Sequence, residues 1–357
     1  MKIALVTTNL RGGGAERVLI RLASMLGARG HEVHIVLLEY LVDHSIDAGL
    51  SLHALTPFGR ACRKGFIGKR IAAWRLRSLV AKLGAHRPFD LVISTLPFAD
   101  EVTRIARLPS LWHRIANTLS AEVARLHGRR RSRRLARYRR LYGDARLIAV
   151  SDGVADDLRR EIGLTNATIR RIYNPYDFDA IRRLAAEPAP DRPNVPYVIH
   201  VGRFAAQKRH DLLFDAWSRL DVPERLVLLT APHDGLNRLI AEHGLTDRVL
   251  VAGFQDNPYP WMQGARLLVL CSDHEGMPNV LVEALACGTP VVSTDCPSGP
   301  REILGPDSRW LVPCRDAARL AAAIRDALQS ASMPSVDLSR FDAPSVLGEI
   351  EALVPAT

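Results

Sequence analysis

The sequence is poor in aromatic residues and has no long apolar run. Only 6% of its 357 residues are Phe, Trp or Tyr, so its cores must be mostly aliphatic, as they are in parallel α/β sheets. No stretch approaches the roughly 18 consecutive apolar residues of a membrane span. The apolar run at residues 2–7 lacks the pattern of a signal peptide. We therefore expect a cytoplasmic protein whose membrane contact is peripheral.

Cysteine is also scarce, and none of the cysteines forms a C-x-x-C pair. Their number is odd, which favours unpaired thiols in a reducing compartment over a disulfide framework. A zinc site needs close ligand pairs, so we expect no metal. The five cysteines are Cys62, Cys271, Cys287, Cys296 and Cys314.

Acidic residues are absent from two strongly basic stretches. Residues 60–87 and residues 125–140 each contain nine Lys or Arg and no Asp or Glu. They hold 18 of the 48 basic residues, which leaves 30 basic against 38 acidic residues elsewhere. The net charge of +10 is therefore a property of two patches in the N-terminal half.

Short apolar runs alternate with helical patterns along the chain, which predicts parallel sheets covered on both faces. The expected helices include residues 15–28, closed by Gly30, and the C-terminal tail at 344–353. The expected strands are residues 2–7, 33–38, 91–94 and 147–150 in the first half, and 197–201, 227–230, 249–251, 267–270 and 291–293 in the second.

A linker divides the two sets of strands. Residues 186–196 contain four prolines and no apolar periodicity. We predict a Rossmann-like acceptor-binding domain at 1–185, a linker at 186–196 and a Rossmann-like nucleotide-sugar domain at 197–340. A helix at 341–357 is expected to pack back on the first domain. Two such domains bind ligands at their strand ends, in a cleft between them.

The segment SDHEGMPNVLVEALACG, residues 272–288, is the most informative. Glu275 lies in the loop after a strand, Pro278 suits a first helical turn, and Gly288 ends the helix. The backbone N–H groups of residues 277–280 and the helix dipole favour anionic or hydroxyl-rich ligands. Glu275 and Glu283 suit hydrogen bonds to polyols, although two surface glutamates beside a helix are the plainer alternative.

A second strand ends in Gly202 and Arg203, and Lys208 follows five residues later. An Arg fork and a Lys point charge together suit a diphosphate. Solvated surface charges are the alternative interpretation. The Gly12–Gly14 cluster fits neither a Walker A nor a G-x-G-x-x-G pattern, because Arg17 occupies the third glycine position. A tight strand-to-helix turn also explains it.

Together these segments resemble glycosyltransferase family 4, which has the GT-B fold, over nearly the whole chain. The most specific element is the E-x7-E motif, Glu275 to Glu283. The other matching elements are Gly-Gly-Ala-Glu at residues 13–16, IYNPYD at 172–177 and VGRFAAQKRHDLL at 201–213.

The resemblance assigns roles to individual residues. It implies that Arg203 and Lys208 hold the donor diphosphate and stabilise the leaving nucleotide, and that Glu283 binds the ribose. Glu275 and the amides of residues 276–279 would hold the donor sugar, and the backbone near Phe254 would meet the base. The donor-site residues implied are Gly14, Phe254, Gly276, Met277, Pro278, Asn279, Val280 and Glu283. Those implied for the acceptor are Gly13, Glu16 and Asn117.

Two departures from the family pattern stand out. Many members carry a His-Asn pair facing the donor sugar, whereas here Ala116 precedes Asn117 and His113 is out of register. A Gly-rich strand end is replaced by residues 230–235, TAPHDG. These departures put a histidine's role and the contacts of that loop in question.

The implied reaction is metal-independent and retains the anomeric configuration. No nucleophile–base pair is evident, so we expect a front-face displacement in which the leaving phosphate accepts the acceptor's proton while cations neutralise its charge. The stretch at residues 296–304, CPSGPREIL, is similar to members that use UDP-hexoses or UDP-N-acetylhexosamines. GDP-mannose remains an alternative donor.

The basic patches suggest the acceptor's location. In residues 66–83 an apolar helical face is flanked by basic residues, which is typical of a helix on anionic lipid; a core-facing helix with a basic outer side is the alternative. The arginines of 125–140 are expected to grip the bilayer or a polyprenyl-diphosphate-linked acceptor.

Other classes fit less of the sequence. A nucleic-acid-binding protein would use the arginine clusters but would leave Glu275 and Glu283 unexplained. A nucleotide-sugar epimerase or a phosphorylase would share the fold.

Overall fold

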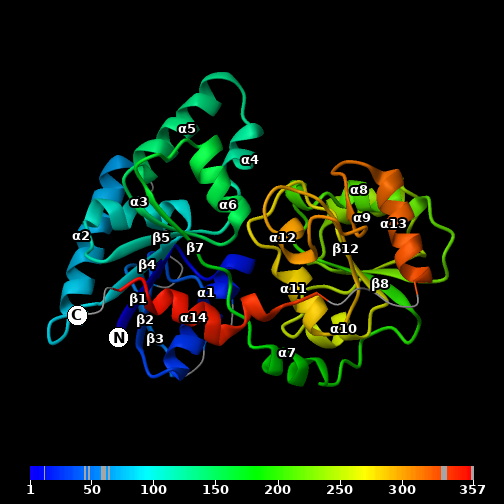
Figure 1. Ribbon diagram of the computed structural model, residues 1–357, viewed down its shortest axis with the longest axis horizontal. Helices are drawn as coiled ribbons and strands as arrows, with labels where there is room; N and C mark the ends of the chain where they lie inside the picture. Colours follow the sequence, from blue (N-terminus) through cyan, green and yellow to red (C-terminus); the bar gives the residue numbers. More distant parts are fainter. Residues whose placement is uncertain are drawn as a thin grey trace. The chain divides into compact units, whose positions relative to one another are not determined.

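The computed structural model describes residues 1–11, 13–43, 46, 49–57, 62, 65–330 and 336–354. Gly12 of the predicted glycine cluster lies outside these residues. The chain divides into two compact units, each built on one parallel sheet (Figure 1). Unit 1 comprises residues 1–175 and 340–357, and unit 2 comprises residues 176–339.

Unit 1 contains a seven-stranded parallel sheet of order β3-β2-β1-β4-β5-β6-β7. The order reverses between β1 and β4, as in doubly wound nucleotide-binding sheets. The strands are β1 (Lys2–Thr7), β2 (Glu32–Leu37), β3 (Ser51–Ala54), β4 (Leu91–Thr95), β5 (Leu111–Ile115), β6 (Arg146–Ala149) and β7 (Thr168–Arg171).

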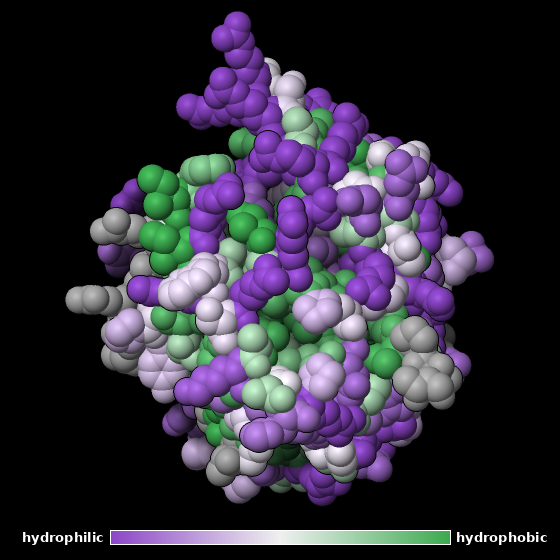
Figure 2. All heavy atoms as spheres, turned by 90° about the vertical axis from the view of Figure 1, so that its left-hand side faces the viewer, coloured by the Kyte–Doolittle hydropathy of each residue, from purple (hydrophilic) through white to green (hydrophobic). Residues whose placement is uncertain are grey.

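Helices flank this sheet, and α2 lies at the left of Figure 1, on the side that Figure 2 turns toward the viewer. A core of β1, β2, β4, α2 and α3 side chains fills the space beneath α2. The helices are α1 (Gly14–Ala28), α2 (Phe66–Leu83), α3 (Pro97–Ala106), α4 (Leu119–Ala124), α5 (Gly128–Tyr142), α6 (Asp152–Asp156), the π-helical η1 (Asp157–Glu161) and α14 (Ala343–Glu351).

Helix α14 comes from the C-terminal end of the chain and contacts α1. The Glu351 carboxylate pairs with the Arg29 guanidinium at 2.9 Å and with the His31 ring at 2.8 Å. The Phe341 ring, which precedes α14, packs edge-on against Tyr173. These contacts hold the returning segment within unit 1.

Unit 2 contains a six-stranded parallel sheet of order β10-β9-β8-β11-β12-β13, which reverses between β8 and β11. The strands are β8 (Tyr197–Val201), β9 (Arg225–Leu229), β10 (Val249–Val251), β11 (Leu267–Leu270), β12 (Val291–Thr294) and β13 (Leu311–Val312). Its helices are α7 (Phe178–Ala185), η2 (Ala206–Lys208), α8 (His210–Ser218), α9 (Asp234–Glu242), α10 (Tyr259–Gln263), α11 (Asn279–Ala286), α12 (Pro300–Leu304) and α13 (Ala317–Gln329), and the short η3 (Ser339–Phe341) leads into α14.

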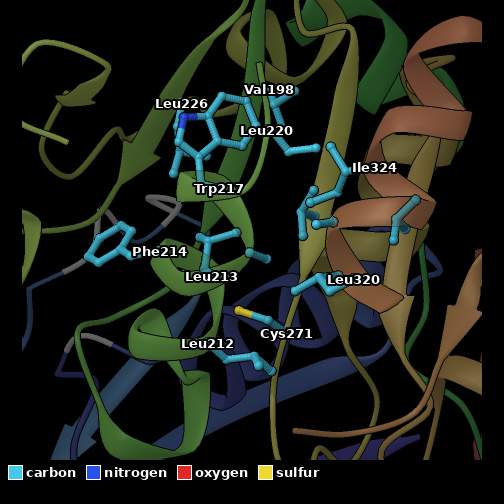
Figure 3. Packing of buried hydrophobic residues seen from close by; sticks show 14 of the residues in the cluster. Val198, Leu212, Leu213, Phe214, Trp217, Leu220, Leu226, Cys271, Leu320 and Ile324 are labelled. Atoms are coloured by element: carbon cyan, nitrogen blue, oxygen red, sulfur yellow. The ribbon is translucent and has the colours of Figure 1, made fainter. Parts of the chain in front are cut away.

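An aliphatic core joins α8 and α13 to the sheet of unit 2. Leu213 and Trp217 of α8 pack with Leu320 and Ile324 of α13 above the strands (Figure 3). Helix α11 instead contacts α7 and α10. The helices that follow the neighbouring strands β8 and β11 therefore belong to different layers, and the loops that precede them diverge at the sheet's reversal point.

The division between the units falls between Pro175 and Tyr176, ten residues before the proline-rich segment expected to be the linker. Residues 186–196 form no helix or strand, and the Arg192 guanidinium donates to the Pro260 carbonyl at 2.9 Å. The division falls before this segment because helix α7 already belongs to unit 2. It buries Ile181 and Ala185 and contacts α10 and α11 of that unit.

Candidate functional site

The loop after β8 carries the two predicted cations. Gly202 directly follows the strand, and its carbonyl accepts a 2.7 Å hydrogen bond from the Thr230 hydroxyl. The Arg203 side chain is exposed and has no ion-pair partner among the residues the structure describes. Lys208 ends η2 with its side chain 20% exposed. An unpaired guanidinium and a partly buried ammonium thus lie at the carboxyl end of this strand.

The loop after β11 carries the first carboxylate of the E-x7-E motif. Glu275 is buried, with 8% of the residue exposed. One of its oxygens accepts hydrogen bonds from the Lys208 ammonium at 2.7 Å and from the Ser272 hydroxyl at 2.6 Å. The structure therefore brings together two residues that are 67 positions apart and that the sequence assigned to one site.

Further bonds hold these two loops in register. The Asp273 N–H donates to the Gln207 carbonyl at 2.9 Å, and the Gln207 amide donates to the His274 carbonyl at 2.6 Å. The Cys271 thiol points to the Lys208 carbonyl at 3.1 Å. Because β8 and β11 flank the reversal point of the sheet, this paired loop lies where open α/β sheets bind ligands.

The amino end of α11 completes this wall. Gly276, Met277 and Pro278 are buried, and Pro278 is the N-cap of the helix rather than a residue of its first turn. Gly299, with a φ of 102°, approaches so closely that an added Cβ would collide with the Pro278 ring. The helix dipole and the first backbone N–H groups of α11 can bind an anion or hydroxyls here.

Glu283 lies inside α11 and is also buried, at 8% exposure. Asn279 and Val280 are half-buried, and the Asn279 side-chain oxygen accepts a 2.5 Å hydrogen bond from the Tyr176 hydroxyl. Tyr176, the first residue of unit 2, thereby fixes the start of the helix. Phe254, in the loop after β10, is 53% exposed.

Two buried histidines, which the sequence patterns did not single out, lie close to Lys208. The His200 and His210 rings meet edge-on, 4.8 Å apart. His200 bonds the Val269 carbonyl at 2.9 Å, but its Nε2 and both ring nitrogens of His210 are buried without a partner. Burial lowers the pKa of His200 to about 4 and that of His210 to about 3. Both rings are neutral at pH 7, so they add no charge beside Lys208.

Two arginines form ion pairs with the loop after β11. Arg209 takes a left-handed φ of 51° and binds the carboxylates of Asp211 at 2.8 Å and Asp273 at 2.9 Å. Arg315 reaches Asp273 at 3.1 Å. The pKa of Asp273 is lowered, because its bonds to Arg315 and Arg209 outweigh the effect of burial, which alone would raise it. This network joins the starts of α8 and α13 to the loop after β11.

The predicted acceptor residues belong to unit 1. Gly13 is the N-cap of α1 with extended backbone, and its carbonyl accepts from the Arg17 N–H at 3.2 Å. Gly14 begins the helix, and the Glu16 side chain lies against Gly13, where any Cβ would collide with it. A side chain at position 13 would therefore displace the Glu16 carboxylate from this turn.

Asn117 and His113 occupy different settings. The Asn117 amide donates to the Glu122 carboxylate at 3.3 Å, and its oxygen accepts from the Thr118 N–H at 3.0 Å, just before α4. His113 is 2% exposed in β5, and its Nδ1 lies 2.7 Å from the Ser94 hydroxyl and 3.3 Å from the Asp100 carboxylate. His113 is thus part of a buried network within unit 1.

No group of three or more His, Cys, Asp or Glu side chains with metal-binding geometry occurs in the part of the chain that the structure describes. In the same residues, no helix is long and apolar enough to cross a membrane.

The fold and this site define a class of α/β protein with two doubly wound parallel sheets, one of which carries cations and a buried carboxylate on the two loops at its reversal point. Comparison with known proteins identifies the family. Residues 12–180 match the model described as glycosyltransferase family 4, and residues 195–330 match the model described as glycosyl transferases group 1. The chain belongs to glycosyltransferase family 4.

Curated relatives act in glycan assembly. One from Campylobacter jejuni, N-acetylgalactosamine-N,N'-diacetylbacillosaminyl-diphospho-undecaprenol 4-alpha-N-acetylgalactosaminyltransferase, is 30% identical over 87% of this chain and 85% of its own length. The lipopolysaccharide 1,6-galactosyltransferase of Escherichia coli is 32% identical over 45% of each chain.

Solved structures share the GT-B fold. Sucrose-phosphate synthase from Thermosynechococcus elongatus superposes with a TM-score of 0.75 at 19% identity, over 99% of this chain and 98% of that one. HepE from Anabaena in complex with UDP-glucose gives 0.71 at 21% identity, with the same coverage. The predicted fold, two parallel α/β sheets of the GT-B class, is confirmed.

Proposed function

We propose that this glycosyltransferase is retaining and metal-independent, and that it moves a hexose or N-acetylhexosamine from a UDP-sugar to a lipid-linked or surface-polysaccharide acceptor at the inner face of the cytoplasmic membrane. The observation that carries the proposal is the loop pair of unit 2, where Arg203 and Lys208 lie on one loop and Glu275 on the next. Cations and a buried carboxylate side by side suit a donor that is anionic at one end and a polyol at the other.

The donor sits, in this proposal, along the wall from β8 to α11. Arg203 and Lys208 bind the diphosphate. Glu275 and the amides of residues 276–279 hold the sugar hydroxyls, and Glu283 binds the ribose. The backbone near Phe254 meets the base, and Gly14 also takes part in donor binding. Gly13, Glu16 and Asn117 serve the acceptor.

The chemistry is a displacement on one face of the sugar ring. The acceptor oxygen bonds to the anomeric carbon as the bond from that carbon to the β-phosphate oxygen breaks. The proton of the acceptor hydroxyl passes to the departing phosphate oxygen. Arg203 and Lys208 neutralise the charge that develops there, so each is worth on the order of 10²–10³ in kcat.

The comparisons support a UDP-sugar and a lipid-linked acceptor. The Campylobacter jejuni relative is named for transfer to a diphospho-undecaprenol-linked glycan, and HepE is solved in complex with UDP-glucose.

An arginine pocket in unit 1 supports an acceptor that carries a diphosphate. It has a volume of about 280 Å³ and is lined by Leu126, Arg130, Arg133, Arg134 and Arg137. All four of these arginines lie on α5 within about two turns of one another, where they can bind several phosphate oxygens. A neutral glycan would need no such charge.

Transfer from UDP-hexoses and UDP-N-acetylhexosamines to a polyprenyl-diphosphate-linked acceptor tests the proposal. Replacing Arg129, Arg130, Arg131, Arg133 and Arg134 by Gln is expected to raise the KM for this acceptor more than tenfold and to leave the UDP affinity unchanged. The matched control is Arg159→Gln with Arg160→Gln, two exposed arginines elsewhere in unit 1. Transfer from GDP-mannose alone, or an unchanged KM, would overturn the corresponding part of the proposal.

A further inference from the structure

Helix α2 has two apolar sides, and only one of them faces the core. Gly68, Ala72, Ala73, Leu76 and Val80 are buried against the sheet and α3. The other side carries the large side chains: Phe66 is 75%, Ile67 72%, Ile71 44% and Trp74 69% exposed. Small residues thus allow α2 to pack closely, and the bulky apolar residues are left in solvent.

These four residues form a patch rather than scattered exceptions. They are half of the eight large hydrophobic side chains that are exposed in the described residues, and they fall within nine consecutive positions. At 100° per residue, Ile67, Ile71 and Trp74 lie within one 60° sector of α2. Figure 2 views this side of unit 1, where hydrophobic spheres gather beside strongly hydrophilic ones.

Cations border the patch on both sides. Arg70 and Arg77 lie on one edge of the sector, and Arg75 and Lys82 lie on the other, all of them exposed. The Arg70 guanidinium lies 5.2 Å from the centre of the Phe66 ring. Helix α2 contains no acidic residue, so this surface combines apolar side chains with positive charge alone.

Helix α5 is joined to α2 through α3. The Glu101 carboxylate of α3 binds both Lys69 of α2 and Arg137 of α5. The bonds to Arg137 and Lys69 keep the pKa of Glu101 low against the effect of burial, so it stays ionised and joins the two helices. The basic pocket of α5 is thereby joined through α3 to the side of α2 that carries Lys69, which faces away from the apolar stripe.

We propose that α2 lies flat in the headgroup layer of an anionic phospholipid bilayer and inserts Phe66, Ile67, Ile71 and Trp74 among the acyl chains. Arg70, Arg75, Arg77 and Lys82 bind the lipid phosphates at the same depth. The helix is about 27 Å long, so the inserted stripe covers several lipids. This inference rests on the proposed function, because it assigns the surface that holds the enzyme at its lipid-linked acceptor.

Charge and composition favour lipid over protein as the occupant. A partner protein would have to be both acidic and apolar along one narrow stripe, whereas an anionic bilayer presents phosphates above acyl chains everywhere. Trp and Arg also suit a membrane interface, because each has an apolar body and a polar end.

Trp74 provides a direct probe. It is the one exposed tryptophan, since Trp112, Trp217, Trp261 and Trp310 are each at most 5% exposed. Purified full-length protein is titrated with vesicles of phosphatidylcholine, with or without 30% phosphatidylglycerol, and with lipids brominated on the acyl chain. We expect binding to the anionic vesicles, a blue shift of the emission and quenching by the brominated lipid. Trp74→Phe should still bind but lose the shift.

Two double variants separate the contribution of the apolar side chains to vesicle binding from that of the cations. Ile67→Ser with Ile71→Ser is expected to weaken vesicle binding at least tenfold, and Val195→Ser, at a comparable exposure of 46% in unit 2, should not. Arg70→Gln with Arg75→Gln should lower the partition coefficient on the order of 30-fold, and high salt should do the same.

Three results would overturn the inference. They are no binding to anionic vesicles, binding without quenching of Trp74, and self-association that Ile67→Ser abolishes, which would make the patch an interface between copies. UDP binding and transfer to a short, water-soluble acceptor are measured on the same variants. If UDP binding and transfer to the soluble acceptor persist while vesicle binding fails, the assignment of α2 as the membrane-binding surface is wrong and the proposed transferase activity stands.

Discussion

The ion pair between Lys208 and Glu275 gives a quantitative prediction for Lys208→Met. The Lys208 and Glu275 side chains are only 20% and 10% exposed, so removing the ammonium leaves a carboxylate that water reaches poorly. Breaking a buried pair costs about 3–5 kcal/mol. The Ser272 hydroxyl still donates to Glu275, which reduces the expected loss to about 2–3 kcal/mol.

Removing the carboxylate instead of the ammonium should lower the stability of the fold less. Glu275→Gln keeps an acceptor for Ser272, and the more exposed Lys208 ammonium can turn toward water, so we expect a loss of about 1 kcal/mol. The double variant should then be more stable than the sum of the single losses predicts, with a coupling of about 1–2 kcal/mol. Arg219→Met is the control, because its pair with Asp215 is half exposed and contributes about 0.5 kcal/mol at most.

Thermal unfolding of unit 2 measures these differences. Each kcal/mol shifts the Tm of a domain of this size by about 2–4 °C, so Lys208→Met should lower it by roughly 5–10 °C. A Tm equal to that of the Arg219→Met control, or strictly additive losses in the double variant, would refute the argument that this pair is desolvated.

The buried pair of histidines in unit 2 and the buried Tyr142 in unit 1 give further predictions. His210→Phe removes two unpartnered ring nitrogens, so it should raise the Tm of unit 2, by an amount equivalent to about 1–2 kcal/mol. His200 and His210 bind protons in the unfolded chain below pH 6.5 but resist them when folded, so stability is full above pH 6.5 and falls toward pH 4. Urea unfolding at pH 7.5 and 5 should show this loss, and His210→Phe should reduce it. Tyr142→Phe removes the 2.7 Å bond to Asp100 and should cost about 1–3 kcal/mol in unit 1; a neutral result would mean that water replaces the hydroxyl.

Much of the fold could be predicted from hydrophobic runs. All nine predicted strands are present to within two residues, because buried parallel strands are continuously apolar. The strands that the pattern missed are short or polar: β5 contains His113 and Arg114, and β7 contains two arginines. Such polar side chains find partners on other elements, as His113 does with Asp100 of α3, and one-dimensional periodicity does not show such partners.

The candidate site was predictable where a motif carried it, and not elsewhere. Lys208 and Glu275 do meet, but their direct ion pair and the neutral histidines behind them depend on packing. In α2 the sequence suggested a single apolar face over residues 66–83, whereas the structure buries Val80 with the small residues on one side and exposes Trp74 on the other. Composition alone does not tell which side of such a helix meets the sheet.

Nucleotide binding tests the central claim most directly. Thermal shift with UDP, GDP and ADP is measured on the wild type, Lys208→Ala, Glu283→Ala and, as a control, Glu242→Ala, an exposed residue of α9. We predict that UDP at 100 times its Kd stabilises the wild type and the control by about 2.7 kcal/mol, and that both site variants lose this gain. Equal stabilisation of all four proteins, or none of the wild type by any nucleotide, would contradict the account.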